Sequence, residues 1–585
     1  MSDQDNAIIA WCDEEVQVHL HSENEPEATT FDSFCQSRPA LAQDTDGQLH
    51  VVWYGNEVKN IYGHVKPGTL LYEAAQFENM WTEPAILARS GAAAQPDISR
   101  DRQGKLNLAW MSSLDESKTV AYATFTPYSC EDYPLSDVSQ TAYNTIRNGG
   151  YYPDTEIIPY CQNQYQRLNF LPKADPRYSD FPPTLNGGFD DLADLIKTAE
   201  YEVLFSTMWY NSDENQDSPG FVVAQAVADL YEQLQNNPER YPQGLTVRIL
   251  LGNPPEFGLG SYTGQVWEVL KDLRAAGVDS MINEELGWRL EVANFDGAWP
   301  HSHTKILVVD GKEILAAGFN LQYEHYAEDH PSGLGGSRQD LGIQVAGPVA
   351  QSAHRVYDDL WIGSQMQICD DFSLNYLWIL TCRPETAVPT HVPEVRKYYL
   401  PGGDSTAFSL YRTKVFDEAD QAVANSIASA QQSVDTMQVM FTLEQVCDLN
   451  ILIRICSFAQ APGYLTGIVQ AAENGADVRL IVKPQPTDGI ESFVAVRMLQ
   501  DELESRGLSD KVQIRLFNDP VHYKTTLIDD NLLIVGSQNF HYSAFGEDNG
   551  LTEYSLGVDD PQAVTDFKRL FERQWEWSTP LKLSE

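Results

Sequence analysis

Long apolar runs are missing from this 585-residue sequence: none reaches the roughly 18–20 residues that a membrane-spanning helix requires. The first five residues, MSDQD, lack the charged start and the long apolar core of a secretory signal. Cysteine is scarce, with eight in the chain and no CxxC spacing, which disfavours a disulfide framework or a zinc site. We therefore expect free buried thiols in a cytoplasmic protein, or in one exported without a classical signal peptide.

Basic residues are few as well. The chain has 39 Lys and Arg against 84 Asp and Glu, a formal net charge of −45. Because nucleic-acid binding draws its affinity from Lys and Arg contacts to phosphates, this balance argues against a nuclease and against a nucleic-acid partner. Hydrophobic residues make up 42% of the chain, which is typical of a globular protein. A chain of 585 residues is too long to fold around a single hydrophobic core, so we expect more than one domain.

One short pattern of polar residues occurs twice, with the two histidines 219 positions apart. Relative to the His, the copies agree at a Lys (+2), an Asp (+7) and an Asn (+17). The copies are His303, Lys305, Asp310 and Asn320, and His522, Lys524, Asp529 and Asn539. On a strand, His and Lys two residues apart project from the same face, and residues 529–531, Asp-Asp-Asn, predict a hairpin turn.

The pair of strings resembles the duplicated His-x-Lys-x4-Asp signature of the phospholipase D superfamily. The resemblance implies one site completed by both copies, in which His303 is the nucleophile and His522 the general acid. Lys305 and Lys524 would hold the phosphate oxygens. The neutral donors to the phosphate would be Asn320, Ser537 and Asn539.

The resemblance also implies that Asp310 and Asp529, at the far ends of their strands, brace the structure more than they take part in chemistry. Copy one departs from the pattern, because Gly318 stands where copy two has Ser537. That half therefore lacks one hydroxyl donor, which puts in doubt how the two halves divide the work.

An attacking imidazole must keep one nitrogen free, which usually requires a carboxylate on the other nitrogen. The resemblance implies one such acid a few tens of residues past each His: Asp340 after His303, and Glu553 after His522. Two lysines and one protonated imidazole supply enough positive charge that we expect no metal and no cofactor. Neither copy carries Asp, Glu and His at metal-ligand spacing. Three further histidines near the motifs could line a pocket, but residues around the site or on the surface are favoured: His301, His325 and His541.

The fold predicted is α/β. Residues 181–365 alternate helices and strands, residues 403–585 repeat that order, and residues 366–402 link them. We expect two diverged phospholipase D-like repeats, each a mixed, mainly parallel sheet flanked by helices, packed as a pseudo-dimer. An apolar stretch within the linker, residues 374–380, could be a surface or a buried strand, and burial is favoured.

A small all-β domain, residues 1–130, is predicted before the repeats, followed by an irregular connector at 131–180. The β domain repeats a pattern in which Pro, Gly and Trp recur 57 residues apart, ending at Trp53 and Trp110. The pattern is similar to propeller blades, but two or three units cannot close a ring, so a small sandwich or open module is favoured. The Trp residues are predicted to be core.

The resemblance implies a phosphodiesterase that cleaves the head group from a glycerophospholipid through a phosphohistidine, giving phosphatidic acid and an alcohol, with possible transphosphatidylation. The partner would be a phospholipid at a membrane surface, met by a monomer with an intramolecular site. Three aromatic residues near the first motif form either an interfacial rim or core: Trp288, Phe295 and Trp299. The alternatives are a cardiolipin or phosphatidylserine synthase-like phosphatidyltransferase, a metal-independent nuclease and a catalytically silent binding protein.

Overall fold

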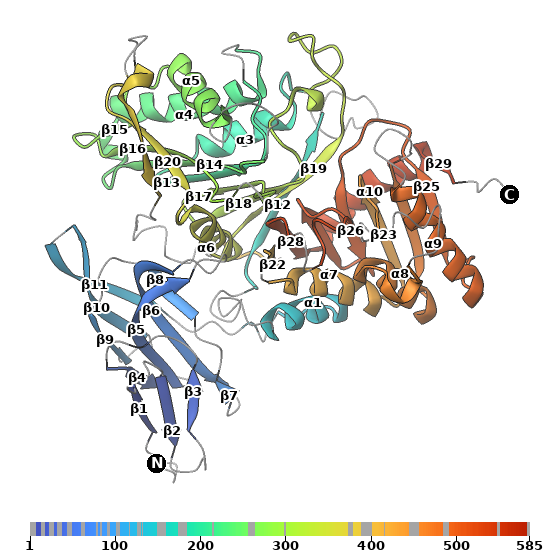
Figure 1. Cartoon of the computed structure of the whole chain (residues 1–585), viewed down its shortest axis with the longest axis horizontal. Coiled ribbons are helices and arrows are strands. Elements are labelled where there is room, and N and C mark those ends of the chain that lie inside the picture. Colours follow the sequence, from blue (N-terminus) through green and yellow to red (C-terminus); the bar gives the residue numbers. More distant parts are fainter. Residues whose placement is uncertain are drawn as a thin grey trace. The chain divides into compact units, whose positions relative to one another are not determined.

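The structure is a computed structural model of the whole chain (Figure 1). The residues it describes are 8–12, 18–22, 28–31, 35, 38–43, 49–59, 65–77, 80–81, 85–89, 94–100, 106–115, 117–125, 130, 133–148, 160–172, 184–212, 216–254, 264–297, 300–372, 378–387, 401–414, 416–443, 456–483, 491–546 and 550–581. The chain divides into two compact units, one made mainly of residues 1–132 and one that contains both repeats. No helix among the described residues is long and apolar enough to cross a membrane.

The N-terminal unit contains three antiparallel sheets, so the predicted all-β domain is confirmed. The first sheet contains β1 (Ile8–Cys12), β2 (Val18–Ser22) and β3 (Thr29–Phe31). The second contains β4 (Ala40–Gln43), β5 (Leu49–Lys59), β6 (Val65–Phe77), β7 (Met80–Trp81) and β8 (Ala85–Arg89). The third contains β9 (Ala94–Arg100), β10 (Leu106–Asp115) and β11 (Ser117–Phe125).

The sequence repeat of this unit appears as two strand pairs, β4–β5 and β9–β10. The second strand of each pair carries a Trp that is part of the core: Trp53 is fully buried and Trp110 is 5% exposed. Trp53 packs with Val18 and Leu20, and Trp110 packs with Val52 and other apolar residues. The prediction that these Trp side chains are core is therefore confirmed.

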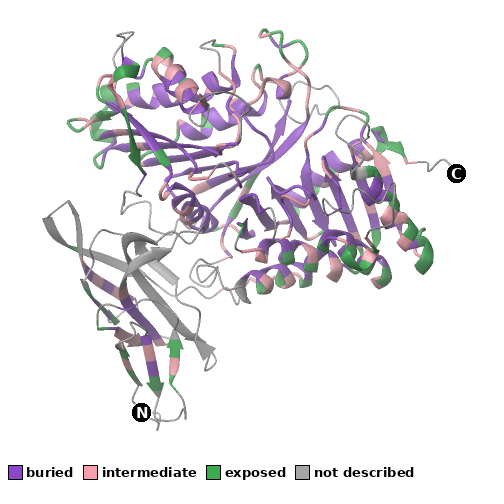
Figure 2. Cartoon of the chain, viewed as in Figure 1, coloured by how far each residue is buried: buried purple, intermediate pink, exposed green. Residues whose placement is uncertain are grey.

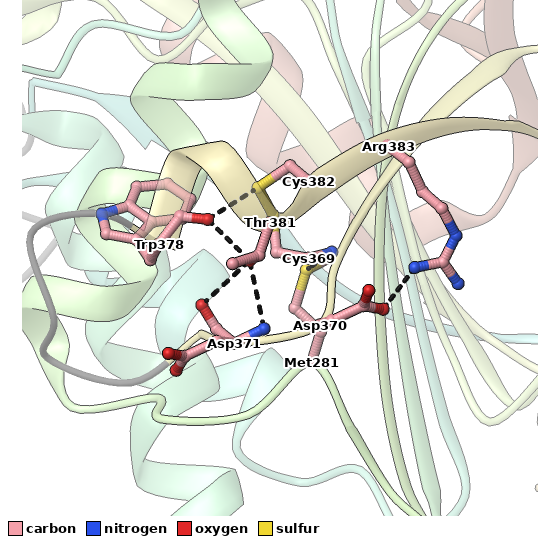
Figure 3. The surroundings of a disulfide bond; sticks show 8 residues. All are labelled: Met281, Cys369, Asp370, Asp371, Trp378, Thr381, Cys382 and Arg383. Atoms are coloured by element: carbon pink, nitrogen blue, oxygen red, sulfur yellow. Dashed lines mark hydrogen bonds and ion pairs between the residues drawn. A yellow bond between two sulfur atoms is a disulfide. The ribbon is translucent and has the colours of Figure 1, made fainter.

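The expectation of free thiols is wrong. Cys12 is bonded to Cys35, Cys369 to Cys382, and three more cysteines are also in disulfides: Cys130, Cys161 and Cys456. The described part of the chain has no free cysteine. The bonded pairs lie 23 and 13 residues apart, so no CxxC-like signature marks them in the sequence. Figure 3 shows the second bond closing the hairpin of β20 (Gln365–Cys369) and β21 (Cys382–Thr386).

The first repeat is built on a ten-stranded sheet with the order β12-β19-β18-β17-β13-β14-β16-β20-β21, and β15 pairs with β16. Three of its strands form a parallel centre: β13 (Glu202–Thr207), β14 (Leu245–Leu251) and β16 (Trp288–Asn294). The crossover helices α4 (Pro219–Asn236) and α5 (Gly264–Ala276) connect them, as parallel neighbours require. The remaining strands are β12 (Gln164–Leu171), β15 (Ile282–Asn283), β17 (Ile306–Val309), β18 (Glu313–Ala317) and β19 (Asp340–Ala346).

Helices cover both faces of this sheet: α3 (Gly188–Ile196), α4 and α5 on one face, and α6 (Val349–Trp361) on the other (Figure 1). The covered strands are buried along almost their whole length (Figure 2). Helix α4 begins at Pro219, directly after Ser218, whose side chain accepts a hydrogen bond from the Phe221 N–H at 3.0 Å and caps the helix.

The second repeat is an eight-stranded sheet with the order β22-β28-β27-β26-β23-β24-β25-β29. Its parallel centre is β23 (Ser433–Gln438), β24 (Asp477–Val482) and β25 (Val512–Leu516), connected through α8 (Gly463–Asn474) and α9 (Glu491–Arg506). The other elements are β22 (Thr406–Arg412), α7 (Glu418–Ser429), β26 (Lys524–Ile528), β27 (Leu532–Gly536), β28 (Glu553–Asp559), α10 (Pro561–Trp577) and β29 (Thr579–Pro580).

The two sheets confirm a mixed α/β fold with two repeats. Only the three central strands of each sheet run parallel, however, and every other pairing in them is antiparallel. The expected "mainly parallel" character is therefore limited to the βαβ part. The hairpins that carry the motifs add the antiparallel strands, since a short turn can join only antiparallel neighbours.

Two segments expected to be irregular carry regular structure. The connector contains α1 (Asp137–Asn148) and β12, and β12 pairs with β19 as an edge strand of the first sheet. The linker contains β21, which pairs with β20 in the same sheet. Of the apolar stretch at 374–380, residues 374–377 lie outside the described residues. Trp378 is buried, but Ile379 and Leu380 are 41% and 79% exposed, so the favoured burial holds only for Trp378.

Candidate active site

Each motif lies on a hairpin next to the parallel centre of its sheet. In copy one β17 and β18 form the hairpin, and in copy two β26 and β27 form it. The motif Asp opens each turn with a left-handed backbone: φ is 54° at Asp310 and 50° at Asp529. Aspartate tolerates this conformation better than most residues because its short side chain can make local hydrogen bonds.

The two motif Asp side chains are held by backbone N–H groups of the neighbouring parallel strand. The Asp310 carboxylate accepts from the N–H groups of Glu200, Tyr201 and Glu202, each at 2.8 Å. The Asp529 carboxylate likewise accepts from three consecutive N–H groups, those of residues 431–433, at 2.8–3.1 Å. These contacts fit the bracing role that the resemblance implies, and they direct both carboxylates away from the histidines.

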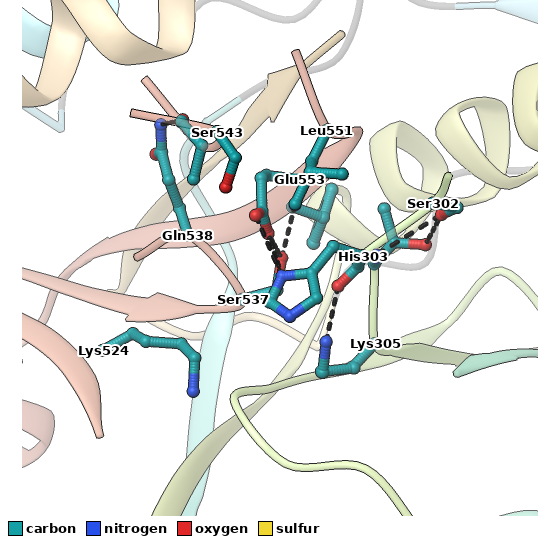
Figure 4. A network of polar contacts seen from close by, with 12 residues as sticks. Ser302, His303, Lys305, Lys524, Ser537, Gln538, Ser543, Leu551 and Glu553 are labelled. Carbon is teal, nitrogen blue, oxygen red and sulfur yellow. Dashed lines mark hydrogen bonds and ion pairs between the residues drawn. The ribbon is translucent and has the colours of Figure 1, made fainter. Parts of the chain in front are cut away.

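The two histidines each bond to an acid of the other repeat. Nδ1 of His303 lies 2.9 and 2.8 Å from the two carboxylate oxygens of Glu553 (Figure 4). Nδ1 of His522 lies 2.7 Å from Oδ2 of Asp340. The acids are those expected from the sequence, but the expected pairing of each His with the acid of its own copy is wrong.

The crossing has a backbone cause. The His303 N–H donates to the carbonyl of Thr552 at 2.8 Å, and the His522 N–H donates to the carbonyl of Gln339 at 2.7 Å. Thr552 and Gln339 directly precede the two acids. Each motif segment therefore pairs with the residue just before a strand of the opposite repeat, β28 or β19, at the bridges Ser302–Thr552 and Gln339–Val521.

The acid partners fix the chemistry of the two rings. A carboxylate accepts a hydrogen bond, so Nδ1 carries the hydrogen and Nε2 of a neutral ring keeps its lone pair. Lys305 and Lys524 are almost completely buried, 2% and 3% exposed, and lie beside the rings. Lys305 Nζ donates to the His303 carbonyl at 2.7 Å (Figure 4), and Lys524 Nζ donates to the carbonyls of His522 and of Gly318, the latter at 3.3 Å.

The surroundings of the two rings differ. Lys524 Nζ also lies 2.7 Å from Nδ1 of His522 and 3.6 Å from Oδ2 of Asp340, whereas the hydrogen bond of Lys305 is made to a backbone carbonyl. The His522 side chain is 19% exposed, and that of His303 is 7% exposed. The site therefore has two unequal halves, and the half that contains His522 is more open to solvent.

Burial dominates the electrostatics. It lowers the pKa of Lys305 to about 7 and that of Lys524 to about 8, because a buried ammonium loses its hydration. Burial and then the two lysines hold the pKa of His303 and His522 well below the usual value. Burial raises the pKa of Glu553 to about 7, opposed by the charge on Lys305. The ammonium groups of the two lysines therefore lose their protons more easily than exposed lysines do. A bound anion would stabilise their charged form.

Ser537 is placed differently from expectation. Its hydroxyl donates to Oε2 of Glu553 at 2.5 Å and accepts from the Tyr554 N–H at 2.9 Å, so it supports the acid of the first histidine (Figure 4). Gly318 has the matching position in copy one. A Cβ on Gly318 would lie 2.4 Å from Oδ1 of Asp340, so the closeness of Asp340 leaves no room for a serine there.

The two motif asparagines lie buried at the ends of their hairpins. The Asn320 amide accepts weakly from the Trp209 N–H at 3.4 Å and donates to Gln322 at 3.3 Å. The Asn539 side chain is 6% exposed, and its Oδ1 makes no hydrogen bond within the described residues. Neither amide is tied up by a strong internal partner, which suits the donor role that the resemblance implies.

Two of the aromatic residues noted from the sequence lie in the core, and one histidine lies closer to the site than expected. Trp288 and Phe295 are 1% and 2% exposed and belong to the core, while Trp299 lies outside the described residues. His325, interpreted as a surrounding residue, is fully buried beside His522, with ring centroids 5.8 Å apart. Its closeness could not be seen in the sequence, because 197 residues and a repeat boundary separate the two histidines.

Fold and site together define a duplicated α/β protein with one composite site, in which two histidines, two lysines and two acids come from both repeats. The family described as "Cardiolipin synthase, PLD-like domain" matches residues 423–575. The probable cardiolipin synthase YwiE of Bacillus subtilis (strain 168) is 23% identical over 345 residues, which cover 59% of this chain and 58% of that protein.

Two further proteins are similar to this chain. A phospholipase D of Streptomyces antibioticus is 23% identical over 407 residues, which cover 57% of this chain and 68% of that protein. A solved structure of phosphatidylserine synthase from Haemophilus influenzae Rd KW20 has a TM-score of 0.45 at 13% identity, covering 76% of this chain and 92% of that chain. The family match and these relatives support a member of the phospholipase D superfamily.

Proposed function

We propose that this protein is a phosphodiesterase of the phospholipase D type, which releases the head-group alcohol from a glycerophospholipid through a phosphohistidine. The observation that carries the proposal is the crossed pair of histidine–acid contacts, His303–Glu553 and His522–Asp340, beside two buried lysines. One ring can attack while the other exchanges a proton, and the lysines can hold the non-bridging oxygens.

The first step joins Nε2 of His303 to phosphorus and breaks the bond from phosphorus to the head-group oxygen. His522, protonated, gives its proton to that leaving oxygen, and Glu553 stabilises the positive charge that develops on His303. In the second step neutral His522 takes a proton from water, the water oxygen attacks phosphorus, and the P–N bond breaks. The products are phosphatidic acid and the free alcohol, and both rings return to their starting state.

The division between the rings is supported by their surroundings. Glu553 contacts His303 through both oxygens and is held in turn by Ser537, which orients a nucleophile firmly. His522 is the more exposed ring, as a group that exchanges protons with an incoming water should be. Its pKa is low in the free site, and a bound phosphodiester would raise it by adding negative charge beside it.

The second candidate is a phosphatidyltransferase, in which the hydroxyl of another lipid or alcohol replaces water in the second step. The likeness to the probable cardiolipin synthase YwiE favours it about as much as the likeness to the Streptomyces phospholipase D favours hydrolysis. Both activities use the same phosphohistidine, so the choice depends on which hydroxyl reaches the site.

The substrate class we propose is a phospholipid met at a membrane surface by a monomer, without nucleic acid and without a cofactor. The net charge of −45 supports the exclusion of nucleic acid, because a strongly acidic surface repels a polyphosphate chain. The disulfides, which are rare in a reducing cytosol, favour the exported location over the cytoplasmic one.

A lipid panel assayed with and without ethanol tests the proposal. Free choline, ethanolamine or glycerol with phosphatidic acid indicates hydrolysis, and phosphatidylethanol or cardiolipin indicates transfer. A parallel assay with DNA in EDTA tests the nuclease alternative. Turnover of DNA faster than of any lipid would overturn the lipid assignment.

A further inference from the structure

A third imidazole lies beside the second histidine–acid pair. His325 comes from a short turn of helix, Tyr323–His325, and is fully buried. Its Nδ1 lies 2.9 Å from the carbonyl oxygen of Arg338. Because a carbonyl can only accept, Nδ1 carries the hydrogen and Nε2 of the neutral ring keeps its lone pair. That Nε2 is buried and has no hydrogen-bond partner among the described residues.

His325 belongs to a compact group of residues whose metal-binding atoms lie close together. One ring nitrogen of His325, one of His522 and one carboxylate oxygen of Asp340 all lie within 4.8 Å of one another. Two imidazoles and one carboxylate form a common protein donor set for Zn²⁺. A metal-binding histidine usually donates its other N–H to a carboxylate or a backbone carbonyl, and the contact from His325 to Arg338 has this form.

We propose that His325, Asp340 and His522 form an inhibitory site for a divalent ion of the Zn²⁺ type. Imidazole nitrogens favour Zn²⁺ over Mg²⁺, which prefers oxygen ligands and keeps its water. The ion replaces the hydrogen that Nδ1 of His522 shares with Asp340 across 2.7 Å, or takes the other ring nitrogen of His522. Binding is independent of the proposed function. The inhibition rests on it, because His522 bound to a metal cannot carry a proton to or from the substrate.

The ion and Lys524 compete for one carboxylate. Lys524 Nζ lies 3.6 Å from Oδ2 of Asp340 and 2.7 Å from Nδ1 of His522, so an ion there must displace the ammonium group or its proton. The lysine-bound state and the metal-bound state are therefore alternatives. This competition sets two opposite expectations for substitutions: removal of a ligand weakens Zn²⁺ binding, and removal of the lysine strengthens it.

The experiment is calorimetric titration of the full-length chain with Zn²⁺, repeated with Co²⁺ and optical absorption to count the ligands. We expect His325→Asn to weaken Zn²⁺ binding at least about tenfold, because loss of a supporting partner alone costs roughly 10–100-fold. Asparagine keeps a donor for the Arg338 carbonyl, so the fold is spared. His541→Phe is the matched control: it changes a histidine of the second repeat that is outside the cluster, and it should bind Zn²⁺ as the wild type does.

Lys524→Met is the second test, since it needs no catalytic activity. We expect it to bind Zn²⁺ more tightly than the wild type. With wild type, micromolar Zn²⁺ should stop head-group release, EDTA should restore it, and Mg²⁺ should have no effect. Equal Zn²⁺ affinity in wild type and His325→Asn would overturn the proposal, as would weaker binding by Lys524→Met. Neither result would affect the lipid assay without zinc, which tests the proposed function separately.

Discussion

At the scale of single residues, the two histidines are distinguished by what holds them. Glu553 keeps a hydrogen on Nδ1 of His303 and is itself fixed by Ser537, while Asp340 shares its oxygens among His522, Lys524 and the Leu341 N–H. An acid that only accepts leaves Nε2 of its histidine free to attack.

Glu553→Gln should therefore reduce turnover strongly, although glutamine has nearly the same size and shape as glutamate. A glutamine amide can donate to Nδ1, which fixes the wrong tautomer and puts the hydrogen on the attacking Nε2. We expect kcat to fall about 10³–10⁴-fold, the range found when a histidine-orienting acid is replaced by its amide. Steady-state rates of head-group release measure it. Ser537→Ala is the milder companion, with a fall of about tenfold, and equal rates for Glu553→Gln and wild type would contradict the role assigned to Glu553.

The two buried lysines predict a pH dependence of anion binding. Burial lowers their pKa to about 7 and about 8, so both lose protons as the pH rises through this window. The ammonium form binds the anion, and affinity should fall by up to about tenfold per pH unit for each lysine that has lost its proton. Inhibition by sulfate, whose charge is constant here, measures the slope between pH 6.5 and 9.5.

Lys524→Arg is the control for that slope, because a guanidinium stays protonated throughout the range. Its sulfate affinity should depend less steeply on pH than that of the wild type. An inhibition constant that does not change with pH in the wild type would show that the lysines keep an ordinary pKa.

At the scale of elements, each hairpin is tied to the parallel strand beside it through its motif Asp. The Asp310 carboxylate binds three backbone N–H groups just before and at the start of β13. Asp310→Ala leaves these donors without an acceptor and also puts a left-handed backbone on alanine. We expect the free energy of unfolding to fall by about 3 kcal/mol.

Asp310→Asn separates the two effects, because asparagine also tolerates the left-handed conformation and keeps one acceptor oxygen. It should lose less stability, about 1–2 kcal/mol. Denaturant unfolding measures both variants. Turnover per folded molecule, assayed well below the melting temperature, should remain close to wild type, and a loss of turnover without a loss of stability would contradict the bracing role.

The periodicity of apolar and polar residues predicted the βαβ elements and the motif hairpins of both repeats. It did not predict β12 and β21, which lie in segments expected to be irregular. The crossed pairing of His303 with Glu553 was not predictable in this way. It depends on two short bridges between segments about 250 residues apart, and no local pattern marks such a pairing. The closeness of His325 to His522 could not be predicted for the same reason, and the disulfides could not because their cysteines have no CxxC-like spacing.

At the scale of the whole molecule, the duplication makes the site intramolecular. His303 and His522, with the acids they contact, belong to one chain, so we expect a monomer to be active without a second copy. Mixing His303→Ala with His522→Ala should therefore restore no head-group release, because neither chain can supply the missing ring to the other. Recovery of activity on mixing, measured against each variant alone at the same total concentration, would show that the working site forms between two chains.

The central claim is that His303 and His522, one from each repeat, form a single site that cleaves a phospholipid head group. Choline release from phosphatidylcholine by wild type, His303→Ala and His522→Ala tests it most directly. We expect release by wild type and a fall of at least about 10⁴-fold in each variant, since residues that act as a unit each cost nearly the whole rate. Equal release by wild type and His303→Ala would contradict the claim.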